Sequence, residues 1–169
     1  PDGAEVVAAA LREGYRLVDT AAQYGNEAAV GEGPAMTALL NGARAVFDVM
    51  RPRSDWLVEA HQFRIQARAQ ETGKPTPEGM HRDGVDFVLV TLIGRENVAG
   101  GVTGIRVDGR GSSPPGETSF TLENPLDTVL LDDRRVWHGV TPVVPIDPSR
   151  PGHRDVLVLT FAQRAPHRE

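Results

Sequence analysis

The sequence contains no cysteine among its 169 residues. Disulfide bonds, thiolate metal ligands and cysteine nucleophiles are therefore excluded. Lysine is almost absent as well, because Lys74 is the one lysine and arginine supplies the rest of the 18 basic residues. An enzyme whose active site needs a lysine could use only Lys74.

The chain also lacks a surplus of positive charge and a long apolar run. Its formal net charge is −5, whereas a nucleic-acid-binding protein usually has a basic face. The longest apolar run, around residues 85–93, is far below the roughly 20 residues that span a bilayer. No signal peptide precedes the expected fold. The sequence thus predicts a soluble, cytoplasmic protein that binds neither nucleic acid nor membrane.

The length and composition suit one globular domain, or one domain with an appendage. Hydrophobic residues make up 40% of the chain and charged residues 24%, which are ordinary values for a globular protein. The chain begins with Pro1 and not with methionine, so we interpret it as a fragment of a longer protein.

The spacing of apolar residues predicts one or two helices near the N-terminus. The first covers residues 2–13 and ends at Gly14, a residue common after helix C-termini. A short strand is expected at residues 15–20. A second helix is expected at residues 35–50, and Pro52 prevents it from continuing.

After Trp56 the sequence changes to short strand-like runs separated by turns. The turns are rich in Gly, Pro, Asn or Asp, as in residues 94–101 and 109–116, and such a pattern is typical of an antiparallel sandwich or barrel. The predicted fold class is mostly β. The candidate strands are residues 61–68, 85–93, 102–107, 118–122, 128–131, 136–143 and 155–161.

Three residues form a candidate metal site. His81 and Asp83 are two positions apart, and residues i and i+2 of an extended chain point to the same side. His138 lies far along the chain, at the start of another strand-like run. Two imidazoles and one carboxylate on one face suit non-haem iron(II) and leave coordination positions open. Taken alone, a His-x-Asp sequence also occurs in surface turns, so that alternative stays open at this point.

Arg154 lies sixteen positions after His138, at the start of an apolar strand. An arginine there is costly to bury unless it meets an anion, and its planar guanidinium fits a carboxylate in two-point geometry. The alternative is that Arg154 pairs with Asp155 or Asp147 on the surface.

Other polar residues have simpler interpretations. Asp132 and Asp133 precede the strand of His138 and are expected to be turn residues, not additional ligands. His61 is expected to be a structural histidine. Arg64, on the same expected strand, is a candidate for contact with a substrate carboxylate.

Four stretches within residues 56–164 resemble the bacterial 2OG-Fe dioxygenase family, whose best-known members hydroxylate free L-amino acids such as isoleucine. The stretches are residues 61–65, 77–87, 131–142 and 153–157. The resemblance implies a double-stranded β-helix, or jelly roll, of the cupin-like kind.

The same resemblance implies roles for the candidate residues. His81, Asp83 and His138 would bind Fe(II), and Arg154 would bind the distal carboxylate of 2-oxoglutarate. The implied activity is hydroxylation of a small substrate, with a free L-amino acid as the expected one. It would use Fe(II), 2-oxoglutarate and O2, with succinate and CO2 as co-products.

Residues 1–33 resemble a different family, the aldo-keto reductases. Asp19 and Tyr24 stand at the positions of two residues of that family's catalytic tetrad. The tetrad also needs a lysine, but Lys74 lies 50 positions after Tyr24, and so short a segment cannot close a TIM barrel. We interpret residues 1–33 as a remnant segment and residues 34–169 as the dioxygenase-like domain.

Three functions remain open from the sequence. The first is an active dioxygenase. The second is a metal-binding jelly roll without turnover, because the N-terminal region that packs against the jelly roll looks shortened to residues 34–55. The third is a fragment of an NADPH-dependent aldo-keto reductase, against which the missing lysine argues.

Overall fold

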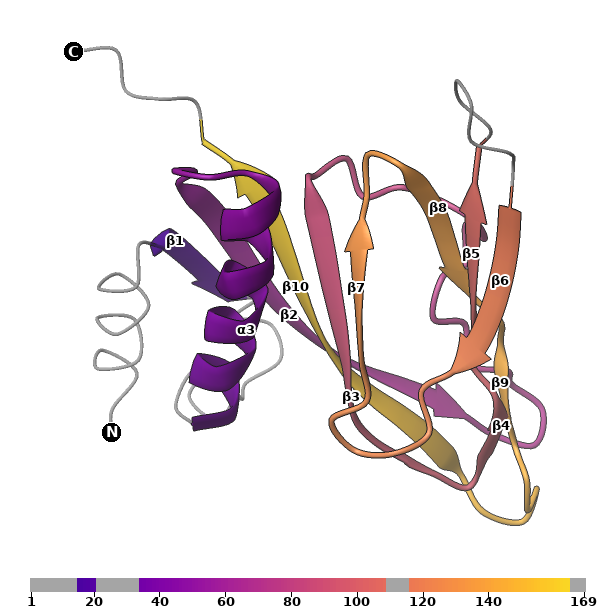
Figure 1. Ribbon diagram of the computed structural model, residues 1–169. Helices are drawn as coiled ribbons and strands as arrows, with labels where there is room; N and C mark the ends of the chain where they lie inside the picture. Colours follow the sequence, from indigo (N-terminus) through magenta and orange to yellow (C-terminus); the bar gives the residue numbers. More distant parts are fainter. Residues whose placement is uncertain (1–14, 21–33, 109–115, 165–169) are drawn as a thin grey trace. The chain divides into compact units, whose positions relative to one another are not determined.

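The computed structural model describes residues 15–20 (their backbone only), 34–108 and 116–164. The described part of the chain is mostly β with one helix, as predicted, and the helix expected at residues 2–13 lies outside it. The elements in chain order (Figure 1) are β1 (Tyr15–Thr20), α3 (Pro34–Met50), β2 (Trp56–Ala67), β3 (Phe87–Glu96), β4 (Val98–Gly100), β5 (Val102–Val107), β6 (Gly116–Thr121), β7 (Thr128–Asp132), β8 (Val136–Val140), β9 (Val143–Pro145) and β10 (Gly152–Gln163).

The strands form three sheets, and the chain divides into two compact units. The strand orders are β1-β2-β10-β3-β7, β4-β9 and β6-β5-β8. The first unit comprises residues 1–62 and 159–169, and the second comprises residues 63–158. No helix in the described ranges is both long enough and apolar enough to cross a lipid bilayer.

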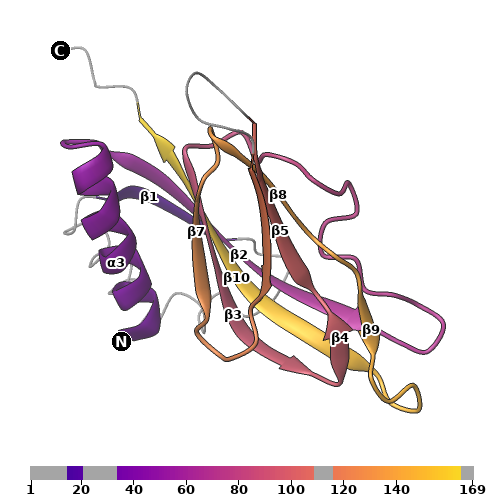
Figure 2. The same cartoon turned by 45° about the vertical axis from the view of Figure 1, so that its right-hand side comes forward.

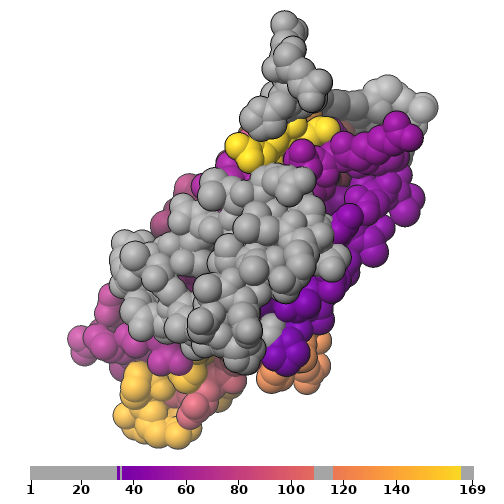
Figure 3. Space-filling view, turned by 90° about the vertical axis from the view of Figure 1, so that its left-hand side faces the viewer, coloured from indigo at the N-terminus to yellow at the C-terminus, as the bar shows by residue number. Residues whose placement is uncertain are grey.

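Helix α3 provides the apolar core of the first unit. Pro34 starts the helix, where its missing N–H costs nothing. Phe47 is fully buried and packs its ring against Trp56 and Phe161, at centroid distances of 5.2 and 4.8 Å. Other atoms of the helix form part of the surface in Figure 3 (indigo to purple). The inner face is defined by buried residues at a spacing of three or four, namely Met36, Leu40, Ala43 and Phe47.

Strand β1 is where the sequence predicted a strand, and it pairs with β2 in parallel. The register runs from Tyr15 opposite Trp56 to Thr20 opposite Ala60, with an irregularity near the start. The segment that resembles aldo-keto reductases therefore contributes a strand that is hydrogen-bonded to the strand following α3.

The second unit is built from antiparallel pairs. Strand β5 lies between β6 and β8, β3 pairs with β7, and β4 pairs with β9 (Figure 2). Its apolar interior includes two clusters, one around Val98 and Val143 and one around Leu92 and Val156, with Ile65 packed against both.

Two strand predictions were wrong in detail, for local reasons. The expected turn at residues 94–101 contains the end of β3 and all of β4, and Asn97 between them has a φ of 50°. The expected strand at residues 136–143 divides into β8 and β9, because Pro142 has no N–H to donate to a ladder.

Candidate metal centre

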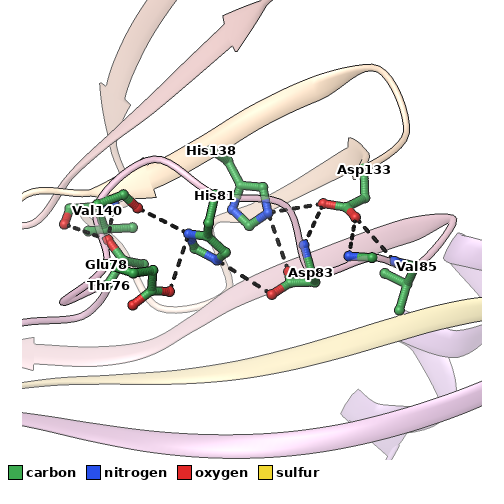
Figure 4. A network of polar contacts seen from close by, with 10 residues as sticks. Thr76, Glu78, His81, Asp83, Val85, Asp133, His138 and Val140 are labelled. Atoms are coloured by element: carbon green, nitrogen blue, oxygen red, sulfur yellow. Dashed lines mark hydrogen bonds and ion pairs between the residues drawn. The ribbon is translucent and has the colours of Figure 1, made fainter.

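The two candidate histidines are joined through their backbones. The His81 N–H donates to the His138 carbonyl at 2.8 Å, and the His138 N–H donates to the His81 carbonyl at 3.0 Å. Directly opposed residues of an antiparallel pair place their side chains on the same face. The two imidazole rings accordingly lie side by side, with centroids 4.5 Å apart (Figure 4).

The Asp83 carboxylate lies against both rings. Its Oδ1 is 3.4 Å from His81 Nε2, and its Oδ2 is 3.3 Å from His138 Nε2 (Figure 4). One ligand atom from each of the three residues lies within 4.8 Å of the other two. The three residues singled out by the sequence are thus brought together, although Asp83 and His138 are far apart in the chain.

The charges at the cluster are coupled. The hydrogen bond from His138 is the largest cause that holds the pKa of Asp83 below its usual value, against the opposing effect of burial. Burial alone would lower the pKa of His138, but Asp83 and the nearby charge of Asp133 outweigh it and raise that pKa. Without an ion, a proton on His138 Nε2 is stabilised by carboxylates. A divalent cation would compete with that proton for the same nitrogen.

His81 is oriented by a further contact. Its Nδ1 is 3.1 Å from the Gly79 carbonyl and 3.4 Å from Glu78 Oε1. A proton on Nδ1 that donates to this carbonyl leaves Nε2 free to face Asp83 and to bind a metal ion. Two imidazole nitrogens and a carboxylate match the donor set preferred by divalent iron, so the residues present fit such an ion.

Arg154 is buried without a partner. It is 1% exposed, and neither its Nε nor its Nη2 has a hydrogen-bond partner in the described structure. Burial, with a smaller effect of Arg95, lowers the pKa of Arg154 to about 10, so the group still carries its charge at neutral pH. A buried guanidinium with free donors fits an anion.

The surface pairing considered for Arg154 does not occur. Asp155 accepts two hydrogen bonds from Arg64 instead, at 2.9 and 2.6 Å. Asp147 accepts hydrogen bonds from Ser149 and Arg150. Arg64 was the candidate for contact with a substrate carboxylate, and in the structure its guanidinium pairs with Asp155.

One cavity of about 880 Å³ in the second unit joins these groups. His81, Asp83, His138 and Arg154 all line it. Its apolar lining includes the side chains of Val88, Val90, Val140, Val156 and Val158. A cavity in which an apolar wall faces convergent polar and charged groups can hold a polar small molecule in one orientation.

Two further features could not be predicted from the sequence. Both Asp132 and Asp133 lie outside the metal-ligand cluster, as expected, but only Asp133 lies in a turn, because Asp132 is the last residue of β7. Asp133 is also only 1% exposed. Trp137 donates to Asp108 at 2.7 Å, and the guanidinium carbons of Arg82 and Arg106 lie 4.7 and 5.6 Å from its ring. Both features depend on residues distant in the chain.

The two tetrad positions of the reductase-like segment have no described side chains. Asp19 belongs to β1, of which only the backbone is described, and Tyr24 lies outside the described residues. Lys74 lines the cavity of the second unit.

Comparison with known proteins gives a family model that matches most of the chain. A family model described as 2OG-Fe dioxygenase matches residues 22–160. The chain is 29% identical over 116 residues to 3(1)-hydroxy-L-isoleucine 4-dioxygenase of Pantoea ananatis, a match that covers 68% of this chain and 45% of the relative.

A solved structure supports the jelly-roll fold. The crystal structure of a bsmA homologue from Methylobium petroleophilum PM1 has a TM-score of 0.67 and 44% identity, covering 79% of this chain and 53% of that one. The chain therefore spans about half the length of these relatives. A partial match is also found to an aldo-keto reductase of Mycolicibacterium smegmatis, 64% identical over 33 residues, which cover 20% of this chain and 12% of the relative.

Proposed function

We propose that this chain, which belongs to the 2OG-Fe dioxygenase family, hydroxylates a small molecule with Fe(II), 2-oxoglutarate and O2, the cofactors and co-substrates of that family. The observation that carries the proposal is the placement of His81, Asp83, His138 and the unpartnered Arg154 around one cavity. A metal bound by the three ligands would face the keto-acid end of 2-oxoglutarate, and the buried cation of Arg154 would face its distal carboxylate.

The ligand residues have distinct tasks in this proposal. His81 and His138 supply neutral imidazole nitrogens, held at a fixed spacing by their reciprocal backbone hydrogen bonds. Asp83 supplies the one negative charge, which offsets part of the charge of a divalent ion. When bound, iron and 2-oxoglutarate supply the oxidising chemistry, with succinate and CO2 as co-products.

Arg154 and the apolar lining shape the rest of the site. The free donors of Arg154 would hold the distal carboxylate of 2-oxoglutarate. Valine side chains such as Val88 and Val156 would exclude water from the reacting groups and limit unproductive oxidation.

We further propose that the substrate is a free L-amino acid. The support is the Pantoea ananatis relative, whose name identifies an amino acid as its substrate. A cytoplasmic location stays a prediction from the sequence.

The second candidate is a metal-binding jelly roll without turnover. It would bind the metal through the same three residues, so the release of succinate distinguishes the two candidates. The division of the chain into residues 1–33 and 34–169 also stays a prediction. The match to the family model begins at residue 22, within the first of these two segments.

An anaerobic titration tests the proposal. Adding Fe(II) and 2-oxoglutarate should produce the visible charge-transfer band of the chelated metal, and Arg154→Ala should weaken 2-oxoglutarate binding. Arg150→Ala is the matched control, because Arg150 is largely exposed and pairs with Asp147. Admitting O2 with each of the twenty amino acids should then release succinate. A band without succinate would favour the jelly roll without turnover. His81→Ala should give no band, and if the unchanged chain also gives none, both candidate functions are excluded.

A further inference from the structure

Asp133 is a fully buried carboxylate beside the proposed metal ligands. It lies in the turn between β7 and β8 and is 1% exposed. A buried carboxylate is costly unless hydrogen bonds satisfy its oxygens. The contacts of Asp133 therefore reveal what its charge stabilises.

Its carboxylate accepts hydrogen bonds from three consecutive backbone amides. The Asp83 N–H donates to Oδ1 at 3.1 Å, and the N–H groups of Gly84 and Val85 donate to Oδ2 at 2.9 and 3.2 Å (Figure 4). Gly84 has a φ of 82°, and this left-handed conformation helps successive amides to converge on one anion. The backbone of Asp83 is thus tied to a side chain fifty positions away.

The same carboxylate also reaches the distal histidine. Oδ1 of Asp133 is 3.3 Å from His138 Nε2, the nitrogen that also faces Asp83. Asp133 is not part of the group whose ligand atoms lie within 4.8 Å of one another. Its oxygens are already occupied by amides, so its geometry is that of a support and not of a fourth ligand.

We propose that Asp133 is a positioning residue, which holds the Asp83 backbone and the His138 ring in the relative arrangement that a divalent metal ion requires. The inference rests on the proposed metal site, to which it adds a residue outside the ligand set. Residues that orient metal ligands commonly contribute to metal affinity without touching the metal.

Replacing Asp133 by asparagine gives a sharp perturbation. The side chain keeps its size, but one oxygen becomes an NH2 group. In one orientation that group faces the donors of Gly84 and Val85, and in the other it faces the Asp83 N–H and His138. Either way a donor meets a donor, and the segment that carries Asp83 must shift.

The test is Co(II) binding to the full chain, followed by titration and by the visible d–d spectrum of the bound ion. We expect Asp133→Asn to weaken Co(II) binding by about 10- to 100-fold and to change the spectrum, because the ligand geometry changes. Asp132→Asn is the matched control, since it removes the adjacent carboxylate, which lies on β7 and outside the metal-ligand cluster. It should bind Co(II) with the affinity and spectrum of the unchanged chain.

A second variant covers the case in which Asp133→Asn does not fold. Gly84→Ala retains Asp133 and places a Cβ where no atom lies within 4 Å, so it strains only the backbone at φ 82°. It should also weaken Co(II) binding and alter the spectrum. Thermal unfolding without metal establishes that each variant is folded.

The outcomes separate this inference from the proposed function. If the unchanged chain binds no Co(II), the proposed metal site is refuted, and so is the positioning role of Asp133. If the unchanged chain binds Co(II), and folded Asp133→Asn binds it equally well with the same spectrum, only the positioning role is overturned. Should Asp133→Asn not fold, unaltered binding by Gly84→Ala overturns it instead.

Discussion

Replacing Arg154 by methionine should have opposite effects on stability with and without 2-oxoglutarate. Methionine retains most of the length of the side chain but removes a buried charge whose Nε and Nη2 have no hydrogen-bond partner. A buried polar group left without a partner costs about 1–3 kcal/mol, and the nearby charge of Arg95 adds to that cost. The variant should therefore gain about 1–3 kcal/mol in free energy of unfolding when no ligand is present.

Bound 2-oxoglutarate should reverse the order of stability of Arg154→Met and the unchanged chain. A ligand at one hundred times its Kd stabilises the folded state by about 2.7 kcal/mol, and about 1 kcal/mol corresponds to roughly 2–4 °C in Tm for a chain of this size. Saturating 2-oxoglutarate with anaerobic Fe(II) should thus raise the Tm of the unchanged chain by roughly 5–10 °C. Arg154→Met, without its carboxylate partner, should show almost no rise.

Thermal unfolding with and without 2-oxoglutarate, at constant Fe(II), measures both effects. Arg150→Met serves as the control, because that exposed arginine pairs with Asp147 and should leave both Tm values unchanged. A variant at Arg154 that is less stable than the unchanged chain, and still responds fully to 2-oxoglutarate, would refute the reasoning about the buried guanidinium.

Three further predictions follow from other parts of the molecule. Metal affinity should fall as the pH is lowered from 8 to 6. The pKa of His138 is raised, and its proton must leave before the metal binds. Calorimetry of metal binding in buffers of different ionisation enthalpy would detect the released proton. Phe47→Ala should cost about 3–5 kcal/mol in urea denaturation, because it leaves a cavity in the core of the first unit. Trp137→Phe should cost about 1.5–3 kcal/mol in the same assay, because it removes the hydrogen bond to the Asp108 carboxylate, and an unchanged midpoint would show that this bond contributes nothing.

Two of the metal-ligand candidates were predictable because their signal is local. His81 and Asp83 are two positions apart, a spacing that places two side chains on one side of an extended chain. His138 was a candidate only as a second histidine at the start of a strand-like run, and the family resemblance supplied its expected role. Helix α3 was predictable for a similar reason, because its buried residues recur at the helical period.

The supporting contacts were not predictable because their partners are remote. Asp133 reads as a turn residue, and its role depends on amides 48 to 50 positions away. Arg154 does not pair with its neighbour Asp155, because Arg64 on another strand already donates two hydrogen bonds to that carboxylate. Sequence patterns report which face a side chain occupies, whereas these contacts depend on which strands are neighbours.

The parallel pairing of β1 with β2 has a consequence for how this chain tolerates change. A parallel ladder is made by main-chain N–H and C=O groups, which every residue except proline offers in the same way. Strand β2 can therefore pair with an added strand through main-chain hydrogen bonds alone. What such a strand needs is an extended run of suitable length.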